Sequence, residues 1–322
     1  MDLRLLGNIE LVDRDERVDL GGPVPRAVIA VLALSANQVV PLERLADAVW
    51  NGEPPASAAR TLQSYIARLR RQLAPAGLTI ETRKPGYLLV VDPGAIDANR
   101  FASLSDQAGA ALDGGDPVAA RRLAGEALAL WRGPALADVA YADFAQPEIA
   151  RLDEARMVTT ELHVEAGLLT GKAAETAAEL ERLVAEHPLR ERFRGQLMRA
   201  LHWTGRTADA LRVYQRGRQL LGEELGVEPG SDLQALEGAI IRNETSVAAP
   251  VATPAVSVGN LPVPITTFVG RQPELADLLA LIGEHRLVTV SGPGGAGKTR
   301  IAVEAASRAS SSRAISGWAK SA

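Results

Sequence analysis

The sequence contains no cysteine among its 322 residues. This absence excludes disulfide bonds, zinc sites with cysteine ligands and catalysis by a thiol. The four histidines are scattered and show no spacing typical of metal ligands; they are His163, His187, His202 and His285. We therefore expect no metal, no catalytic residues and no enzyme activity.

The sequence also has no long hydrophobic run. No uninterrupted apolar stretch approaches the roughly 20 residues that a membrane-spanning helix needs. Residues 1–4, Met-Asp-Leu-Arg, alternate charged and apolar side chains. The N-terminus therefore lacks the basic n-region and the apolar h-region of a secretory signal. We expect a cytoplasmic protein with no membrane contact. Its 47% hydrophobic and 23% charged residues are typical of globular proteins, and its length suggests two or three domains.

Charge is distributed unevenly along the chain. The whole sequence carries a net charge of −4, but residues 57–91 hold six basic residues and one acid, a local charge of +5. The basic residues are Arg60, Arg68, Arg70, Arg71, Arg83 and Lys84, and the acid is Glu81. Because affinity for nucleic acid depends on local neutralisation of phosphates, this segment is a candidate nucleic-acid interface.

Composition divides the chain into four parts. Residues 1–93 mix strand-like runs with helices, and residues 97–243 are rich in Ala, Leu, Arg and Glu at helical spacing. Residues 244–267 contain prolines and small residues, which are typical of a linker. Residues 268–322 have a helical pattern and then the run "RLVTVSG" (286–292), which predicts a strand. The fold class is mainly α with small β.

The second part contains an internal repeat. Gly171 and Gly205 lie in similar contexts, "TGKAA" and "TGRTA", and are separated by 34 residues, the tetratricopeptide period. Helices are predicted after both glycines, over residues 173–186, 189–203, 208–221 and 232–241. An earlier pair is predicted over 98–112 and 117–130. Helices of this kind stack into a curved surface that usually binds protein.

The first part has the pattern of a winged helix-turn-helix. "LRLLGNIEL" (3–11) and "RVDL" (17–20) each predict a short strand. Three helices are predicted over residues 25–37, 41–50 and 57–73, with proline at the start of the second and Ser57 as N-cap of the third. "TIETRKPGYLLVV" (79–91) then predicts a hairpin with its turn at residues 84–86.

The third predicted helix has two different faces. At 100° per residue, one face is apolar and consists of Leu62, Tyr65, Ile66, Leu69 and Leu73. The opposite face is polar, small and cationic and includes Arg60, Ser64, Ala67, Arg68 and Arg71. An exposed arginine-rich face is often only a solvated surface. Here it coincides with a helix-turn-helix pattern, a polar face without acids and a basic hairpin, and this combination favours a helix that enters the major groove.

The candidate DNA-binding residues come from this helix and from the hairpin tip. They are Arg60, Thr61, Gln63, Ser64, Arg68, Arg71, Arg83 and Lys84. Arginine suits guanine edges and phosphates, and the shorter polar side chains suit phosphates or base edges. The hairpin would act as a wing against the neighbouring backbone or minor groove.

Four stretches of the sequence resemble a known family. "LERLADAVWNGEPPASAARTLQSYIARLRRQL" with "TRKPGYLL" is similar to the OmpR-type winged helix of the Streptomyces antibiotic regulatory protein family. "ALALWRGPALADV" and "HPLRERFRGQLMRALHWTGRTADALRVYQRGRQLLGEELGVEPG" resemble the all-helical, tetratricopeptide-type bacterial transcriptional activation domain that follows it there. The resemblance covers about residues 1–243.

The resemblance implies a transcriptional regulator, usually an activator of secondary-metabolite genes such as those for antibiotics. Its members bind tandem direct repeats in double-stranded promoter DNA, which favours two copies on DNA, and they help to recruit RNA polymerase holoenzyme. Activation rather than repression rests on this resemblance alone. Many members carry a basic residue after the Gly-Tyr of the wing, where this chain has Leu88. This difference leaves Arg83 and Lys84 as the main charges of the wing.

A phosphate-loop motif lies near the end of the sequence. "GPGGAGKT" fits G-x-x-x-x-G-K-T between a predicted strand and a predicted helix. Its candidate nucleotide-binding residues are Gly292, Gly294, Gly295, Gly297, Lys298 and Thr299. Together with "FVGR" upstream it resembles the entry to an NB-ARC-type ATPase domain of larger family members.

Hydrolysis needs a second, acid-bearing strand that holds Mg²⁺. The 23 residues after Thr299 contain one acid, Glu304, and no strand-like run. We expect an incomplete domain without ATP hydrolysis and with little nucleotide affinity, so that ATP and Mg²⁺ would be cofactors only of a complete domain. Micromolar ATP binding would contradict this expectation.

Two other functions compete with DNA regulation. A nucleotide-gated signalling ATPase would need the missing strand. A helical-repeat scaffold that binds only protein would not need the +5 segment.

Overall fold

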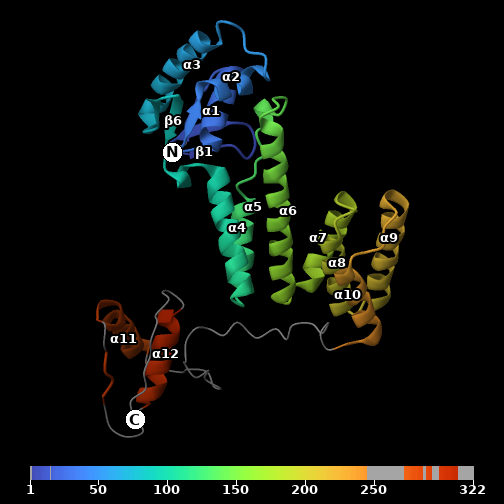
Figure 1. Ribbon diagram of the computed structural model, residues 1–322. Coiled ribbons are helices and arrows are strands. Elements are labelled where there is room, and N and C mark those ends of the chain that lie inside the picture. The colour runs from blue at the N-terminus through green and yellow to red at the C-terminus, as the bar shows by residue number, and fades with distance from the viewer. Residues whose placement is uncertain (1, 15, 245–271, 286–287, 292–296, 311–322) are drawn as a thin grey trace. The chain divides into compact units, whose positions relative to one another are not determined.

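The computed structural model describes residues 2–14, 16–244, 272–285, 288–291 and 297–310. Contacts divide the chain into two compact units, Met1–Val251 and Ala252–Ala322 (Figure 1). Apart from Glu244, the predicted linker lies outside the described residues.

The first unit begins with a small antiparallel sheet. Its strands are β1 (Asp2–Arg4), β2 (Glu10–Asp13) and β3 (Glu16–Val18), in that spatial order. Our prediction of one strand over residues 3–11 is wrong, because the chain turns between β1 and β2. Gly7 lies in this turn with a φ of +147°, a value that L side chains rarely adopt.

The backbone of this turn bonds to a segment far along the chain. The amides of Arg132 and Leu136 donate to the carbonyls of Leu6 and Leu5, each at 2.9 Å, and the amide of Ala137 donates to Gly7 at 3.1 Å. The backbone carbonyls of residues 5–7 therefore accept hydrogen bonds from a remote loop instead of from a neighbouring strand.

Three helices and a second sheet complete the winged helix. The helices are α1 (Pro23–Leu34), α2 (Leu42–Trp50) and α3 (Ala58–Leu73). The second sheet has the order β4-β6-β5, from β4 (Val39–Pro41), β5 (Thr79–Arg83) and β6 (Gly86–Val90). This arrangement confirms the predicted winged helix. The second helix begins one residue later than predicted, because Pro41 ends β4.

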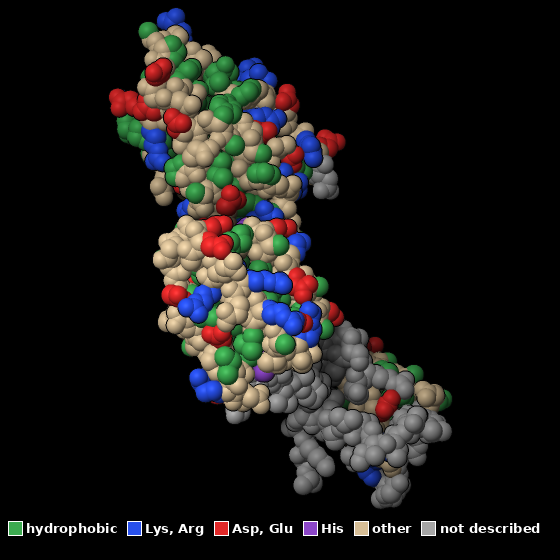
Figure 2. Space-filling model, turned by 90° about the vertical axis from the view of Figure 1, so that its right-hand side faces the viewer, with side chains coloured by type: hydrophobic (Ala, Val, Ile, Leu, Met, Phe, Trp, Pro, Cys, Tyr) green, Lys and Arg blue, Asp and Glu red, His purple; other side chains and the backbone are tan. Residues whose placement is uncertain are grey.

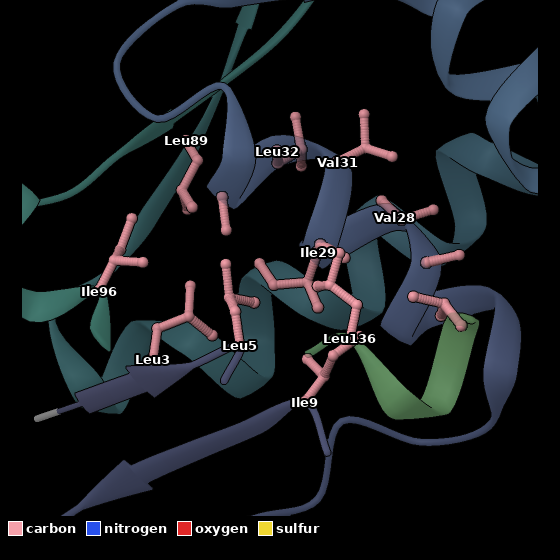
Figure 3. Close-up of a cluster of buried hydrophobic side chains, with 14 of the residues drawn as sticks. Leu3, Leu5, Ile9, Val28, Ile29, Val31, Leu32, Leu89, Ile96 and Leu136 are labelled. Carbon is pink, nitrogen blue, oxygen red and sulfur yellow. The ribbon is translucent and has the colours of Figure 1, made fainter. Parts of the chain in front are cut away.

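Apolar side chains from both sheets and α1 meet in one core (Figure 3). Leu5, Ile29 and Leu89 are fully buried there. Leu136 also lies in this core although it follows the winged helix in sequence. The core therefore includes part of the helical region.

Residues 97–242 form seven helices. They are α4 (Asp97–Asp113), α5 (Pro117–Leu128), α6 (Ala145–Leu169), α7 (Ala173–Glu186), α8 (Glu191–Trp203), α9 (Thr207–Leu225) and α10 (Ser231–Arg242). Short 3₁₀ turns are η1 (Ala74–Ala76), η2 (Pro93–Ala95) and η3 (Ala137–Val139). Gly171 and Gly205 have φ of +78° and +80° and stand two residues before α7 and α9. The 34-residue spacing thus marks equivalent helix starts.

Helix α6 contributes to two hydrophobic clusters. Ala145 and Leu152, in its first half, pack into the core of the winged helix. Val164 and Leu168, in its second half, pack into a separate cluster with α7, α8, α9 and α10. A single helix therefore joins the two packed regions of the first unit.

The second unit contains α11 (Gln272–Glu284) and α12 (Lys298–Ser310), which pack through Leu275, Leu278, Ile301 and Ala305. The predicted strand over 286–292 is not found in its described part, residues 288–291. A strand is stable only beside a partner, and the described part of this unit offers no second strand. None of the helices among the described residues has the length and hydrophobicity that a membrane-spanning helix needs.

Candidate nucleic-acid interface

The apolar face of α3 fixes the orientation of this helix. Leu62, Ile66, Leu69 and Leu73 are almost fully buried against the winged-helix core, and Tyr65 is half-buried. The packing face predicted from the helical wheel is confirmed. The opposite face consequently points to solvent.

Five of the six candidates on α3 are exposed, and Thr61 is half-buried. The exposed ones are Arg60, Gln63, Ser64, Arg68 and Arg71. Positions 60, 64, 68 and 71 follow the i, i+4, i+8, i+11 spacing that places side chains in one stripe along a helix. The Ser64 hydroxyl donates to the carbonyl of Arg60 at 3.2 Å. The stripe presents polar and cationic groups together.

The cations of this surface differ in how far they are neutralised. Within the described residues, Arg60, Arg71 and Lys84 form no ion pair. Arg68 lies 3.9 Å from the exposed carboxylate of Asp19, a loose contact. Arg83 is paired with Glu81 at 2.8 Å. The surface therefore has free positive charge on both the helix and the hairpin.

The hairpin that forms the wing has a two-residue tip. Arg83 pairs with Gly86 in register, so Lys84 and Pro85 form the turn. A Cβ at Gly86 would lie 1.8 Å from the carbonyl oxygen of Val40, so β6 approaches β4 more closely than any other residue would allow. Gly86 thus holds the tip end of the hairpin against β4.

Leu88 is placed where it supports the sheet. It is half-buried in β6, opposite Val39 of β4 and Glu81 of β5. This central position fits an apolar residue. The wing charges that remain are Arg83 and Lys84.

Two residues near the interface were not among the predicted candidates. Asp19 approaches Arg68, and the carbonyl of Asp19 accepts a hydrogen bond from Gln72 at 2.5 Å. Arg70 turns toward the hairpin and donates to Ile80 and Thr82. Arg70 lies about 80° from Leu62 on the helical wheel, at the margin of the buried face. This angle was the available signal for Arg70, whereas nothing local indicated Asp19.

Buried polar contacts hold the winged helix on the helical region. Asp97, which is 2% exposed, accepts from the amides of Leu5 (2.6 Å) and Leu6 (3.1 Å) and lies 3.4 Å from Arg132. Burial raises the pKa of Asp97, and these contacts offset the effect only in part. Arg26 pairs with Asp138 at 2.7 Å. The joint therefore combines an apolar core with specific charges.

The phosphate-loop candidates are described only at their end. Gly292, Gly294 and Gly295 lie outside the described residues. Gly297 has a φ of +71°, and α12 starts at Lys298 and includes Thr299. The described residues thus show only the helix that follows the motif, and the phosphate loop itself stays a prediction.

Comparison with known proteins agrees with this architecture. Residues 17–89 match the family "Transcriptional regulatory protein, C terminal", and residues 96–241 match the bacterial transcriptional activator domain. A winged helix with an exposed cationic helix, followed by this domain, defines a transcriptional regulator.

Individual relatives specify the family. Regulatory protein DnrI of Streptomyces peucetius is 38% identical over 77% of this chain and 94% of its own length. Regulatory protein AfsR of Streptomyces coelicolor is 38% identical over 95% of this chain. The solved structure of Mycobacterium tuberculosis EmbR in complex with a low-affinity phosphopeptide matches with a TM-score of 0.74 and 34% identity, over 76% of this chain and 65% of that chain. The chain belongs to the Streptomyces antibiotic regulatory protein family. It spans about a third (32%) of the length of AfsR.

Proposed function

We propose that this chain is a sequence-specific DNA-binding regulator that activates antibiotic-biosynthesis genes. The observation that carries the proposal is the unpaired, exposed charge of Arg60 and Arg71 on α3 and of Lys84 on the wing. A cation without a carboxylate partner can neutralise a phosphate without first breaking an ion pair. The relatives, which are named regulatory proteins, support the same function.

Within this proposal, α3 enters the major groove and the hairpin lies on the adjacent backbone. The DNA contacts are assigned to Arg60, Thr61, Gln63, Ser64, Arg68, Arg71, Arg83 and Lys84. Family membership supports a promoter with tandem direct repeats, two copies of the chain side by side, and RNA polymerase as a partner. Such a regulator acts in the cytoplasm, where the bacterial chromosome lies.

The test starts from a library of random 30-base-pair duplexes. Purified protein selects its binding sequences, and the affinity of the selected duplex is measured by fluorescence anisotropy at fixed salt. We expect Arg68→Ala and Arg71→Ala each to weaken binding by about tenfold, the usual loss for an arginine that contacts a base. Their melting temperatures should match that of the wild type.

Arg122→Ala is the matched control, because Arg122 is exposed in α5 and paired with Glu126 at 2.7 Å. Its affinity for the duplex should remain that of the wild type. Unchanged binding in both α3 variants would refute the assignment of the recognition helix. Failure of the wild type to enrich any duplex would refute the proposed function itself.

A further inference from the structure

Arg70 and Arg71 are neighbours on α3 but have different surroundings. Arg71 is exposed and unpaired among the described residues, as a DNA-contacting residue should be. Arg70 is half-buried, and its guanidinium lies between α3 and the β5–β6 hairpin. The guanidinium of Arg70 therefore makes its contacts within the protein.

Three contacts tie Arg70 to the hairpin. Its Nε donates to the carbonyl of Ile80 at 2.7 Å, and an Nη donates to the hydroxyl of Thr82, also at 2.7 Å. Its Cζ lies 5.8 Å from the centre of the Tyr87 ring, within the range of a cation–π interaction. Since Tyr87 is on β6 and the other two residues are on β5, a single side chain contacts both strands of the wing.

The position of β5 explains why this contact matters. β5 is the outer strand of the β4-β6-β5 sheet, so one of its edges has no strand partner. Arg70 supplies a donor to that edge at Ile80. A two-stranded hairpin by itself is only marginally stable, so contacts from outside the hairpin help to hold it. The contact at Thr82 lies close to the tip, because Thr82 stands two residues before Lys84.

We infer that Arg70 is a positioning residue that fixes the wing relative to the recognition helix, so that Lys84 and α3 engage DNA as one rigid surface. This inference rests on the proposed function. Lysine cannot replace arginine in this role, because a single ammonium lacks the planar fork that reaches a carbonyl, a hydroxyl and a ring together.

The test is a double-mutant cycle between the fork and the wing tip. Thr82→Val removes the hydroxyl acceptor at nearly constant shape, and Thr82→Ser keeps it as the matched control. Lys84→Ala is combined with each variant and with Arg70→Lys, and affinity is measured for the duplex selected by the wild type. Lys84→Ala should weaken the wild type and Thr82→Ser by about threefold to tenfold, as expected for one phosphate contact.

In Arg70→Lys and Thr82→Val the further loss caused by Lys84→Ala should fall to less than about twofold, because the wing is no longer held in place. Hydroxyl-radical footprints should show that these two variants lose protection on the wing side of the site and keep it under α3. An equal loss from Lys84→Ala in all four backgrounds would overturn the inference. If Arg70→Lys does not fold, Thr82→Val still decides.

A second measurement needs no DNA. Amide hydrogen exchange in β5 and β6 should be about tenfold faster in Arg70→Lys, while exchange in α7, α8 and α9 stays unchanged. Unchanged exchange in the hairpin would overturn the inference even if the wild type selected no duplex. Failure of the wild type to select any duplex would refute the proposed function, and it would leave the exchange result as a separate test of Arg70.

Discussion

Arginines occur in both packed regions of the first unit, but their surroundings differ. On α3, Arg60 and Arg71 face solvent without a carboxylate partner in the described structure. In the helical region, Arg190 contacts Glu154 and Glu161, and Arg199 contacts Glu165. Figure 2 shows basic side chains (blue) and acidic side chains (red) beside one another over the helical region.

Arg60 and Arg71 therefore differ from Arg190 and Arg199 in ion pairing, because only the latter two have carboxylate partners among the described residues. A paired arginine must break its ion pair before it can bind a phosphate. Its carboxylate partner neutralises its charge, so its electrostatic attraction for DNA is weaker. Substitution of Arg60 or Arg71 should therefore change DNA affinity, and substitution of Arg190 or Arg199 should change stability.

The largest contrast should come from the same substitution in the two regions. Gly86→Ala places a Cβ 1.8 Å from the Val40 carbonyl oxygen and should lower the free energy of unfolding by about 4 kcal/mol. Gly109 lies inside α4, and no atom lies within 4 Å of the place that an added Cβ would take, so Gly109→Ala should raise stability by about 0.5–1 kcal/mol. Urea unfolding of both variants tests the pair. A small loss for Gly86→Ala would show that β4 can move away.

The next largest effect should come from a paired arginine. Arg190→Ala leaves Glu161, whose side chain is 5% exposed, without its closest partner and should cost about 3 kcal/mol of unfolding free energy. Affinity of the folded variant for the selected duplex should not change. Arg182→Ala is the control, because its pair with Glu186 is exposed and should contribute less than about 0.5 kcal/mol. A loss of DNA affinity in Arg190→Ala would contradict the assignment of DNA binding to α3 and of stability to the ion pairs of the helical region.

The smallest effect should be an opposite pH dependence of two buried carboxylates. Burial raises the pKa of Glu165, but the hydrogen bond and charge of Arg199 outweigh it, so the net pKa lies below the ordinary 4.5. Its stabilising contribution is present above pH 4.5 and is lost as the pH falls through the lowered value. Asp97 differs, because burial holds its pKa above the ordinary 3.8, and its contribution is full below 3.8 and lost as the pH rises through the raised value.

Urea unfolding between pH 7 and pH 4 of Glu165→Gln and Asp97→Asn measures this contrast. The stability advantage of the wild type over Glu165→Gln should shrink on acidification, and its advantage over Asp97→Asn should grow. Parallel changes in the two differences would contradict the assigned causes.

The sequence predicted what depends on local periodicity. The buried face of α3 and the start of α7 followed from the spacing of apolar residues and glycines. The features that were missed depend on remote partners. The turn at Gly7 exists because Arg132 and Leu136 bond to its neighbours, and no pattern near residue 7 indicates those residues.

The candidate site shows the same limit. Charge and the helical wheel placed Arg60 and Arg71 on the exposed face, but could not show that Arg83 is paired with Glu81 or that Arg70 contacts the hairpin. Both depend on the geometry of strands that form only in the folded domain. The DNA contacts and the domain boundaries remain predictions.

The length of helix α6 fixes how the two packed regions of the first unit are rotated against each other. Its 25 residues span about 37 Å at 1.5 Å per residue, and its two halves belong to different cores. Substitutions along it change packing locally, but an insertion of one residue near its middle would rotate one core against the other by about 100°. The helix thus sets the rotation of one packed region against the other, and that rotation tolerates changes of residue type far better than changes of length.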